Sequence, residues 1–142
     1  MNASAQRALV VLAACIFLGF GLWLFCVPEA LAGIGIVLET PEARIDIRAT
    51  YGGMELGFAT FLLLCASRPE WTHVGLVASA CGIAGFGLGR LGGILLEGEG
   101  TSLMWIFLGI ELAATGVYLA AIRASSAESA GSDDAEGRSV AL

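Results

Sequence analysis

The sequence has little charge and no lysine. Only 14% of its 142 residues are charged, and arginine supplies all seven strong bases. A soluble domain has roughly 25% charged residues, which give its surface enough polarity to stay in water. Because this chain is 57% hydrophobic with a mean hydropathy of +0.83, most of its apolar surface must face lipid. The composition excludes an ordinary soluble domain and predicts a small integral membrane protein.

The shortage of basic residues and of metal ligands excludes further classes of function. The net charge is −6 and the arginines are scattered, whereas nucleic-acid binding needs concentrated basic residues. One histidine, His73, and cysteines without a C-x-x-C spacing offer no converging ligands for a metal or a haem. They also complete no Ser/His/Asp or Cys/His nucleophile set. We therefore expect no nucleic-acid partner, no metal and no cofactor.

Long apolar stretches determine the predicted architecture. A membrane-spanning helix needs about 20 mostly apolar residues. The four stretches that meet this requirement are residues 8–27, 44–66, 72–96 and 103–122. They predict an all-α membrane protein, an antiparallel up-down bundle of four transmembrane helices within residues 1–123. Residues 124–142 are small, polar and acidic, and this composition predicts a disordered tail.

Charges outside the spans predict the orientation in the membrane. Arginines gather on the side shared by both chain ends, at Arg7, Arg68 and Arg123. Acidic residues crowd the opposite side: Glu29, Glu39, Glu42, Asp46, Glu97 and Glu99. Because positively charged loops stay in the cytoplasm, we expect both termini, and with them the acidic tail, to be cytoplasmic.

Four ionisable residues lie inside the predicted spans: Arg48, Glu55, Arg90 and Glu111. Each would cost about 2.5–3.5 kcal/mol at the centre of a lone helix, so such residues usually pair or line a wet cavity. Arg48, Tyr51 and Glu55 follow an i, i+3, i+7 spacing, which predicts one shared helix face. Arg90 and Glu111 fall at a similar depth on the next two spans. We expect all five side chains to converge in the outer half of the bundle, with the acids facing the arginines and Tyr51 bridging them.

Three interpretations of these charges remain open at the level of sequence. Two Arg–Glu pairs can neutralise each other and fix the register of the helices. Alternatively, the residues form a polar pocket that receives a ligand headgroup or relays a proton. In the third interpretation Arg48 and Arg90 extend to the outer membrane interface.

Glycines at regular spacing predict close helix packing. Gly85, Gly89 and Gly93 form a stripe on the third span, and Gly53 with Gly57 form a shorter one on the second. Small residues at this spacing let a neighbouring helix approach closely, within the chain or between copies. The run 87–92 also matches the G-x-G-x-x-G dinucleotide fingerprint, but that motif requires a preceding strand, which an apolar stretch of helical length does not supply.

One element has a specific resemblance. Arg48-Ala-Thr-Tyr51-Gly-Gly53-Met-Glu55-Leu-Gly57, with Arg90 and Glu111 on later spans, resembles a bacterial family of small four-helix membrane proteins that is a domain of unknown function. That family is distantly similar to the DoxX-like proteins. The resemblance covers about residues 8–123 and implies a bundle in the bacterial inner membrane. It implies no catalysis.

Three hypotheses for function follow from these residues. In the first, Arg48, Tyr51, Glu55, Arg90 and Glu111 bind a small amphipathic molecule such as a lipid or a quinone, and the protein is not an enzyme. In the second, the glycine stripes dock the chain onto a larger membrane complex or a second copy. In the third, Glu55 or Glu111 is the proton site of a proton-coupled carrier, a role that usually requires an inverted repeat.

Overall fold

The computed structural model describes the backbone of residues 1–140 and the side chains of residues 1–125. Every regular element in this part of the chain is helical, and the four predicted spans are confirmed as helices long and apolar enough to cross a membrane. In chain order the elements are α1 Ala3–Cys26, the 3₁₀ helix η1 Pro28–Ile34, α2 Pro41–Ile47, the π-helical segment η2 Arg48–Gly53, α3 Met54–Ser67, the 3₁₀ helix η3 Pro69–Trp71, α4 Thr72–Glu97 and α5 Ser102–Val140.

The helix ends follow from local sequence chemistry. The Asn2 side chain accepts a hydrogen bond from the Ala5 N–H at 2.9 Å and so caps the start of α1. Thr40 caps α2 in the same way, immediately before Pro41. At the C-terminal end of α4, Gly98 adopts φ +74°, a left-handed conformation that glycine allows without strain and that ends the helix.

The fourth membrane-length helix extends beyond the predicted end of its span. α5 continues from Ser102 to Val140, so no helix end separates the span from the acidic residues that follow it. The predicted disorder of residues 124–142 falls mostly on residues whose side chains lie outside the described part, and it stays a prediction.

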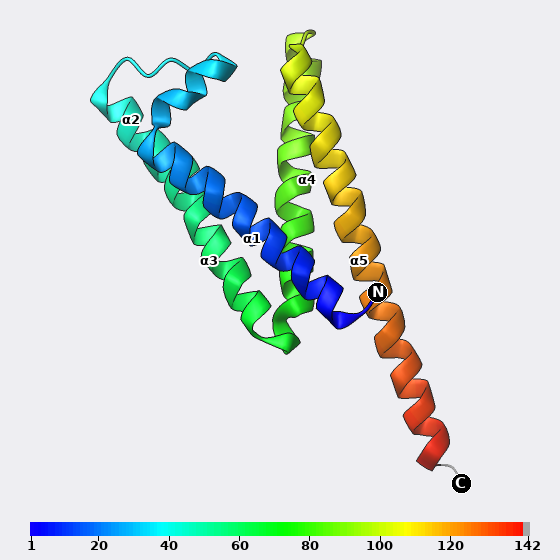
Figure 1. Cartoon of the computed structure of the whole chain (residues 1–142). Coiled ribbons are helices and arrows are strands. Elements are labelled where there is room, and N and C mark those ends of the chain that lie inside the picture. Colours follow the sequence, from blue (N-terminus) through cyan, green and yellow to red (C-terminus); the bar gives the residue numbers. More distant parts are fainter. Residues whose placement is uncertain (141–142) are drawn as a thin grey trace.

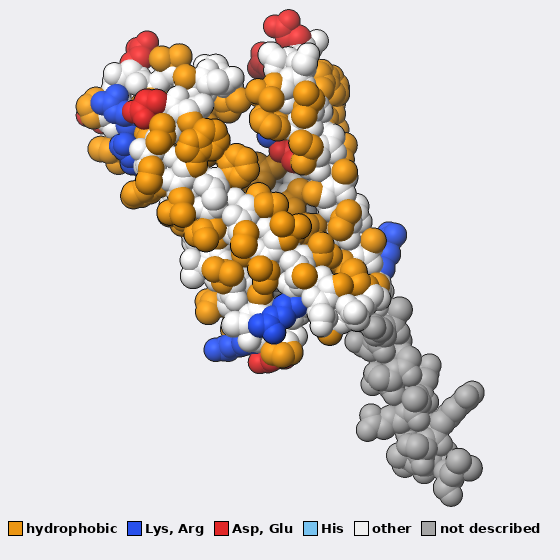
Figure 2. Space-filling view, viewed as in Figure 1, with side chains coloured by type: hydrophobic (Ala, Val, Ile, Leu, Met, Phe, Trp, Pro, Cys, Tyr) orange, Lys and Arg blue, Asp and Glu red, His pale blue; other side chains and the backbone are white. Residues whose placement is uncertain are grey.

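The helices form two arms that diverge from a common base (Figure 1). α1 packs mainly against α3 in one arm, and α4 packs mainly against α5 in the other. The arms meet near the N-terminus and the α3–α4 connection, which we call the closed end (Figure 1). They separate toward α2 and the α4–α5 connection, which we call the open end. A hollow is visible between the arms on the open side (Figure 2).

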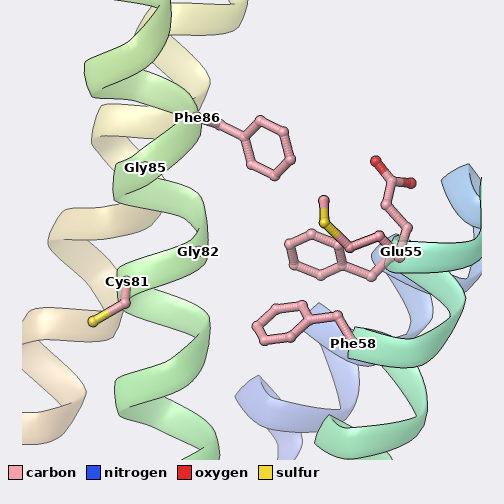
Figure 3. Close-up of a pocket in the computed structure, with 8 residues that line it drawn as sticks. Glu55, Phe58, Cys81, Gly82, Gly85 and Phe86 are labelled. Atoms are coloured by element: carbon pink, nitrogen blue, oxygen red, sulfur yellow. The ribbon is translucent and has the colours of Figure 1, made fainter. Parts of the chain in front are cut away.

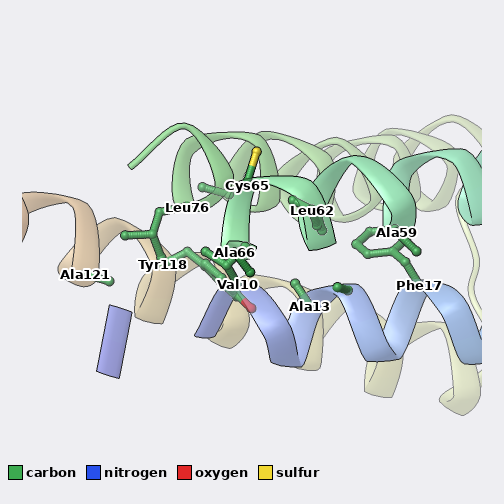
Figure 4. Packing of buried hydrophobic residues seen from close by; sticks show 12 residues of the cluster. Val10, Ala13, Phe17, Ala59, Leu62, Cys65, Ala66, Leu76, Tyr118 and Ala121 are labelled. Carbon is green, nitrogen blue, oxygen red and sulfur yellow. The ribbon is translucent and has the colours of Figure 1, made fainter. Parts of the chain in front are cut away.

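The buried core joins the two arms near the closed end (Figure 4). Six of its members are alanines, whose small side chains let the helices approach closely: Ala13, Ala14, Ala59, Ala66, Ala80 and Ala121. Larger side chains, such as those of Val10, Leu62 and Leu76, fill the space between them. The Tyr118 hydroxyl donates a hydrogen bond of 2.8 Å to the Leu9 carbonyl and ties α5 to α1. This core holds the two arms together at the closed end, and it does not extend to the open end.

Candidate functional site

An apolar cavity lies at the level where the two arms begin to diverge. Its volume is about 410 Å³, and its walls come from α1, α3 and α4. The lining residues are Phe17, Met54, Glu55, Phe58, Cys81, Gly82, Gly85 and Phe86 (Figure 3). Glu55 is the charged residue among them. The cavity therefore has the composition typical of a small-molecule site, with apolar walls and a polar group at one position.

The Glu55 side chain is buried, and one of its two carboxyl oxygens lacks a partner. Its side chain leaves the first turn of α3 and extends into the gap between α3 and α4, on the Phe86 side of Phe58 (Figure 3). Glu55 is only 8% exposed, and its Oε2 atom has no hydrogen-bond partner. A buried carboxyl group without a partner is costly, so this position requires an explanation beyond packing.

Three phenylalanines form the aromatic wall of the cavity. The rings of Phe17 and Phe58 meet edge to face with centroids 4.7 Å apart, a preferred geometry for aromatic pairs. Phe86 approaches Phe17 with a centroid distance of 6.3 Å. Gly82 leaves room for Phe58, because a Cβ atom at Gly82 would lie 3.3 Å from the Phe58 ring. The Cys81 side chain is turned away from the gap (Figure 3).

Arg90 and Glu111 form a separate ion pair that joins α4 to α5. Arg90 donates from its terminal Nη2 to Glu111 Oε1 at 2.7 Å and from Nε to Oε2 at 3.0 Å. Its other terminal nitrogen contacts the Met104 sulfur at 3.3 Å, and its guanidinium lies 5.1 Å from the centre of the Phe107 ring. Because both carboxylate oxygens and all three guanidinium nitrogens have partners, this pair is satisfied inside one arm.

Arg48 and Tyr51 do not join Glu55. The expected pairing of Arg48 with Glu55 is not found, because Arg48 Nε donates to the Phe25 carbonyl at the end of α1, at 2.9 Å. Tyr51 is 38% exposed and bridges no ion pair among the described side chains. The five predicted site residues are therefore not together. Arg90 and Glu111 pair between α4 and α5, and Arg48 contacts the end of α1. Tyr51 is exposed, and Glu55 is buried apart from the other four.

The π-helical segment η2 explains this division. The i, i+3, i+7 spacing places Arg48 and Glu55 on one face only if the helix between them has 3.6 residues per turn. In η2, Arg48–Gly53, the turns are wider, and an extra residue changes the angular position of a side chain by about 100°. Arg48 is therefore rotated away from Glu55 and toward the end of α1.

The five predicted packing glycines meet no other helix within the described chain. No atom lies within 4 Å of an added Cβ at Gly57, Gly85, Gly89 or Gly93, and at Gly53 the nearest is the Arg48 carbonyl of its own helix. Other glycines make the close contacts. A Cβ at Gly52 would lie 2.9 Å from the Phe25 Cα, and one at Gly75 would lie 2.7 Å from a Val10 methyl carbon.

The G-x-G-x-x-G run and the candidate metal ligands fall at places that do not suit those chemistries. Residues 87–92 lie inside α4, so no strand leads into them and no helix begins there. Among residues 1–125, no three side chains of His, Cys, Asp or Glu gather closely enough to hold a metal ion.

The aromatic wall was not among the site residues predicted from the sequence. Phe58 follows Glu55 by three residues and Phe86 follows Gly82 by four, so both pairs share a helix face. That spacing was the available signal. It was hidden by the many other apolar residues, since a helix that faces lipid is apolar on every side.

The comparisons with known proteins give a family and no activity. No curated protein and no solved structure matches the chain. A family model does match, over residues 5–122, and this range begins in α1 and ends in the membrane-length part of α5. The chain belongs to the family described as Domain of unknown function (DUF4345).

Proposed function

We propose that this protein binds a small amphipathic molecule in the cavity between its two arms, with Glu55 as the polar contact. One observation carries the proposal: a carboxyl group that is 8% exposed and has an unpartnered oxygen lies in an apolar cavity of about 410 Å³. A ligand headgroup that reaches Glu55 would supply the missing partner and remove the cost of burial.

The other predicted site residues have structural roles in this proposal. Arg90 and Glu111 satisfy each other and hold α4 against α5, while Arg48 holds the end of α1. Glu55 is therefore the polar contact of the ligand, and the apolar part of the ligand lies against the phenylalanine wall. A lipid or quinone remains a candidate because both combine a polar head with an apolar tail.

Native mass spectrometry of the protein in lipid particles tests this proposal. We expect a discrete adduct on the wild type that is lost or strongly reduced in Glu55→Leu, which removes both the charge and the hydrogen-bonding atoms of the side chain. Glu70→Leu is the matched control, because Glu70 is an exposed acid at the α3–α4 connection. A wild type without an adduct, or equal adducts on both variants, would contradict a Glu55 site.

A second candidate function is that of a subunit in a homo-oligomer or a larger membrane complex. The observation that favours it is the open surface at Gly85, Gly89 and Gly93, where no atom of the described residues outside their own helix lies within 4 Å of an added Cβ. A partner helix packed there would be disrupted by Gly89→Leu. Unchanged assembly of Gly89→Leu, measured by native mass spectrometry, would count against this candidate.

We further propose that the protein resides in the bacterial inner membrane with both termini in the cytoplasm. The distribution of charge supports this orientation, since Arg7 and Arg68 are near the closed end while Glu97 and Glu99 are at the open end. The distant relationship to DoxX-like proteins is likewise a proposal, supported by the Arg48–Gly57 element.

A further inference from the structure

We propose that the ligand of this cavity is an amphipathic cation, with an ammonium headgroup that contacts Glu55 and an apolar tail that lies along the phenylalanine wall. This inference rests on the proposed function and specifies its ligand. The headgroup belongs either to a lipid or to a free amine, and the chemistry that the cavity recognises is the same for both.

The charge of the lining favours a cation. Glu55 is the lining residue with a carboxyl group, and none of the lining residues is basic. A carboxylate in an apolar cavity attracts a positive charge strongly and repels a phosphate or carboxylate headgroup. An anionic headgroup would also find no N–H donor among the lining side chains, so its own burial would remain uncompensated.

The aromatic residues favour the same ligand class. Phe17, Phe58 and Phe86 present rings around the cavity, and the face of an aromatic ring attracts a cation. Phenylalanine offers no hydrogen bond to a hydroxyl, amide or sugar headgroup. An alkylated ammonium group needs few hydrogen bonds, so a carboxylate together with aromatic rings satisfies it better than it satisfies a neutral polar headgroup.

The electrostatics of the open end agree with this assignment. Acidic side chains are found at the tips of both arms (Figure 2), including Glu42 and Asp46 on α2 and Glu97 at the end of α4. With Glu29, Glu39 and Glu99, these acids outnumber the nearby arginines, Arg44 and Arg48. A cation that approaches the gap from this side meets a negative potential, which raises its local concentration.

A neutral hydrogen-bond acceptor, such as a quinone, is the main competing ligand. It would need Glu55 in its acid form as a donor, and a glutamine amide at the same position can donate equally well. A cation instead needs the negative charge. The substitution Glu55→Gln therefore separates the two chemistries, because it keeps a donor and removes the charge.

The test measures binding of three probes to the full chain in uncharged maltoside micelles by titration calorimetry. The probes are trimethyl(2-phenylethyl)ammonium, its neutral isostere with carbon in place of nitrogen, and a short-chain benzoquinone. We expect the ammonium probe to bind about 10-fold or more tightly than the isostere, as a charge-assisted contact implies. Glu55→Gln should abolish that preference and Glu70→Gln should keep it.

A second variant keeps the test decisive if Glu55→Gln does not fold. Phe58→Leu preserves the carboxylate and removes one ring, so it should weaken the ammonium probe several-fold and leave the isostere nearly unchanged. Added phosphatidylcholine distinguishes the two sources of the headgroup. Displacement of the ammonium probe by this lipid assigns the cation to a lipid headgroup, and retention of the probe assigns it to a free amine.

Failure of the ligand class differs from failure of the proposed function. Equal affinity for the ammonium probe and its isostere, or quinone binding that persists in Glu55→Gln, would overturn the cation and leave a ligand cavity in place. If no probe binds and the native protein carries no adduct, the proposed function itself is overturned.

Discussion

Glu55 and Glu111 lie in helices of membrane-spanning length but have opposite surroundings, and they should respond differently to substitution. Glu111 accepts three charged hydrogen bonds from Arg90, and removal of one partner leaves the other charge without compensation. We expect Glu111→Ala to lower the free energy of unfolding by about 3 kcal/mol, the lower range for a buried pair that loses one member. Unfolding with dodecyl sulfate in mixed micelles measures this change.

The control for this prediction restores neutrality. Adding Arg90→Met to Glu111→Ala removes the uncompensated charge, so the double variant should recover most of the lost stability. Glu99→Gln, at an exposed position beyond the end of α4, should have almost no effect. A double variant as unstable as the single one would show that the pair does more than hold α4 and α5 together.

Glycine positions give a second prediction at the residue scale. A Cβ at Gly52 would lie 2.9 Å from the Phe25 Cα, and a backbone atom cannot move aside as a flexible side chain can. We expect Gly52→Ala to cost about 1–3 kcal/mol of stability through overpacking. Gly89→Ala is the matched control, since nothing lies within 4 Å of its Cβ position. Equal melting shifts for the two variants would refute the close contact of α1 with η2.

At the scale of the element, the π-helical segment η2 determines what Arg48 can do. Arg48 donates to the carbonyl of Phe25 in the last turn of α1, where a cation also complements the helix dipole. Arg48→Gln should therefore lower the free energy of unfolding by about 1 kcal/mol. It should leave any adduct at Glu55 in place, as native mass spectrometry of the variant can show.

Arg44→Gln, on the adjoining helix α2, is the control for Arg48→Gln. Arg44 approaches Glu29 only to 3.9 Å in an exposed pair, and such a pair contributes little to stability. If Arg48→Gln removes the adduct while the fold persists, Arg48 contacts the ligand and its role as an end cap of α1 is secondary.

The same element shows where prediction from sequence succeeds and where it stops. The spans were predictable because length and hydropathy are properties of each segment alone. The contact between Arg90 and Glu111 was predictable, because both residues lie on regular helices and their sequence positions place them at a similar depth in the membrane. The position of Arg48 was not, because a single π-helical turn changes which face it occupies. The sequence also could not show which glycines contact another helix, because an apolar helix face can lie against lipid as well as against the core.

At the scale of the whole molecule, the positions of the helix ends predict which connections are accessible from each side of the membrane. In a variant with its four cysteines replaced by alanine, we expect a membrane-impermeant maleimide applied from outside to label Glu99→Cys and not Ser67→Cys. Permeabilised cells supply the control, because both positions should then react. Labelling of Ser67→Cys in intact cells would reverse the proposed orientation.

The divergence of the arms has a consequence for how binding must be quantified. A cavity bounded by Phe86 of one arm and Met54 of the other, both more than 40% exposed, opens onto the gap between the arms, which acyl chains would fill in a bilayer. A ligand would therefore reach it after partitioning into the bilayer, and its mole fraction in lipid, not its aqueous concentration, sets the occupancy. At a fixed amount of protein and ligand, doubling the lipid dilutes the ligand and weakens the apparent affinity by the same factor.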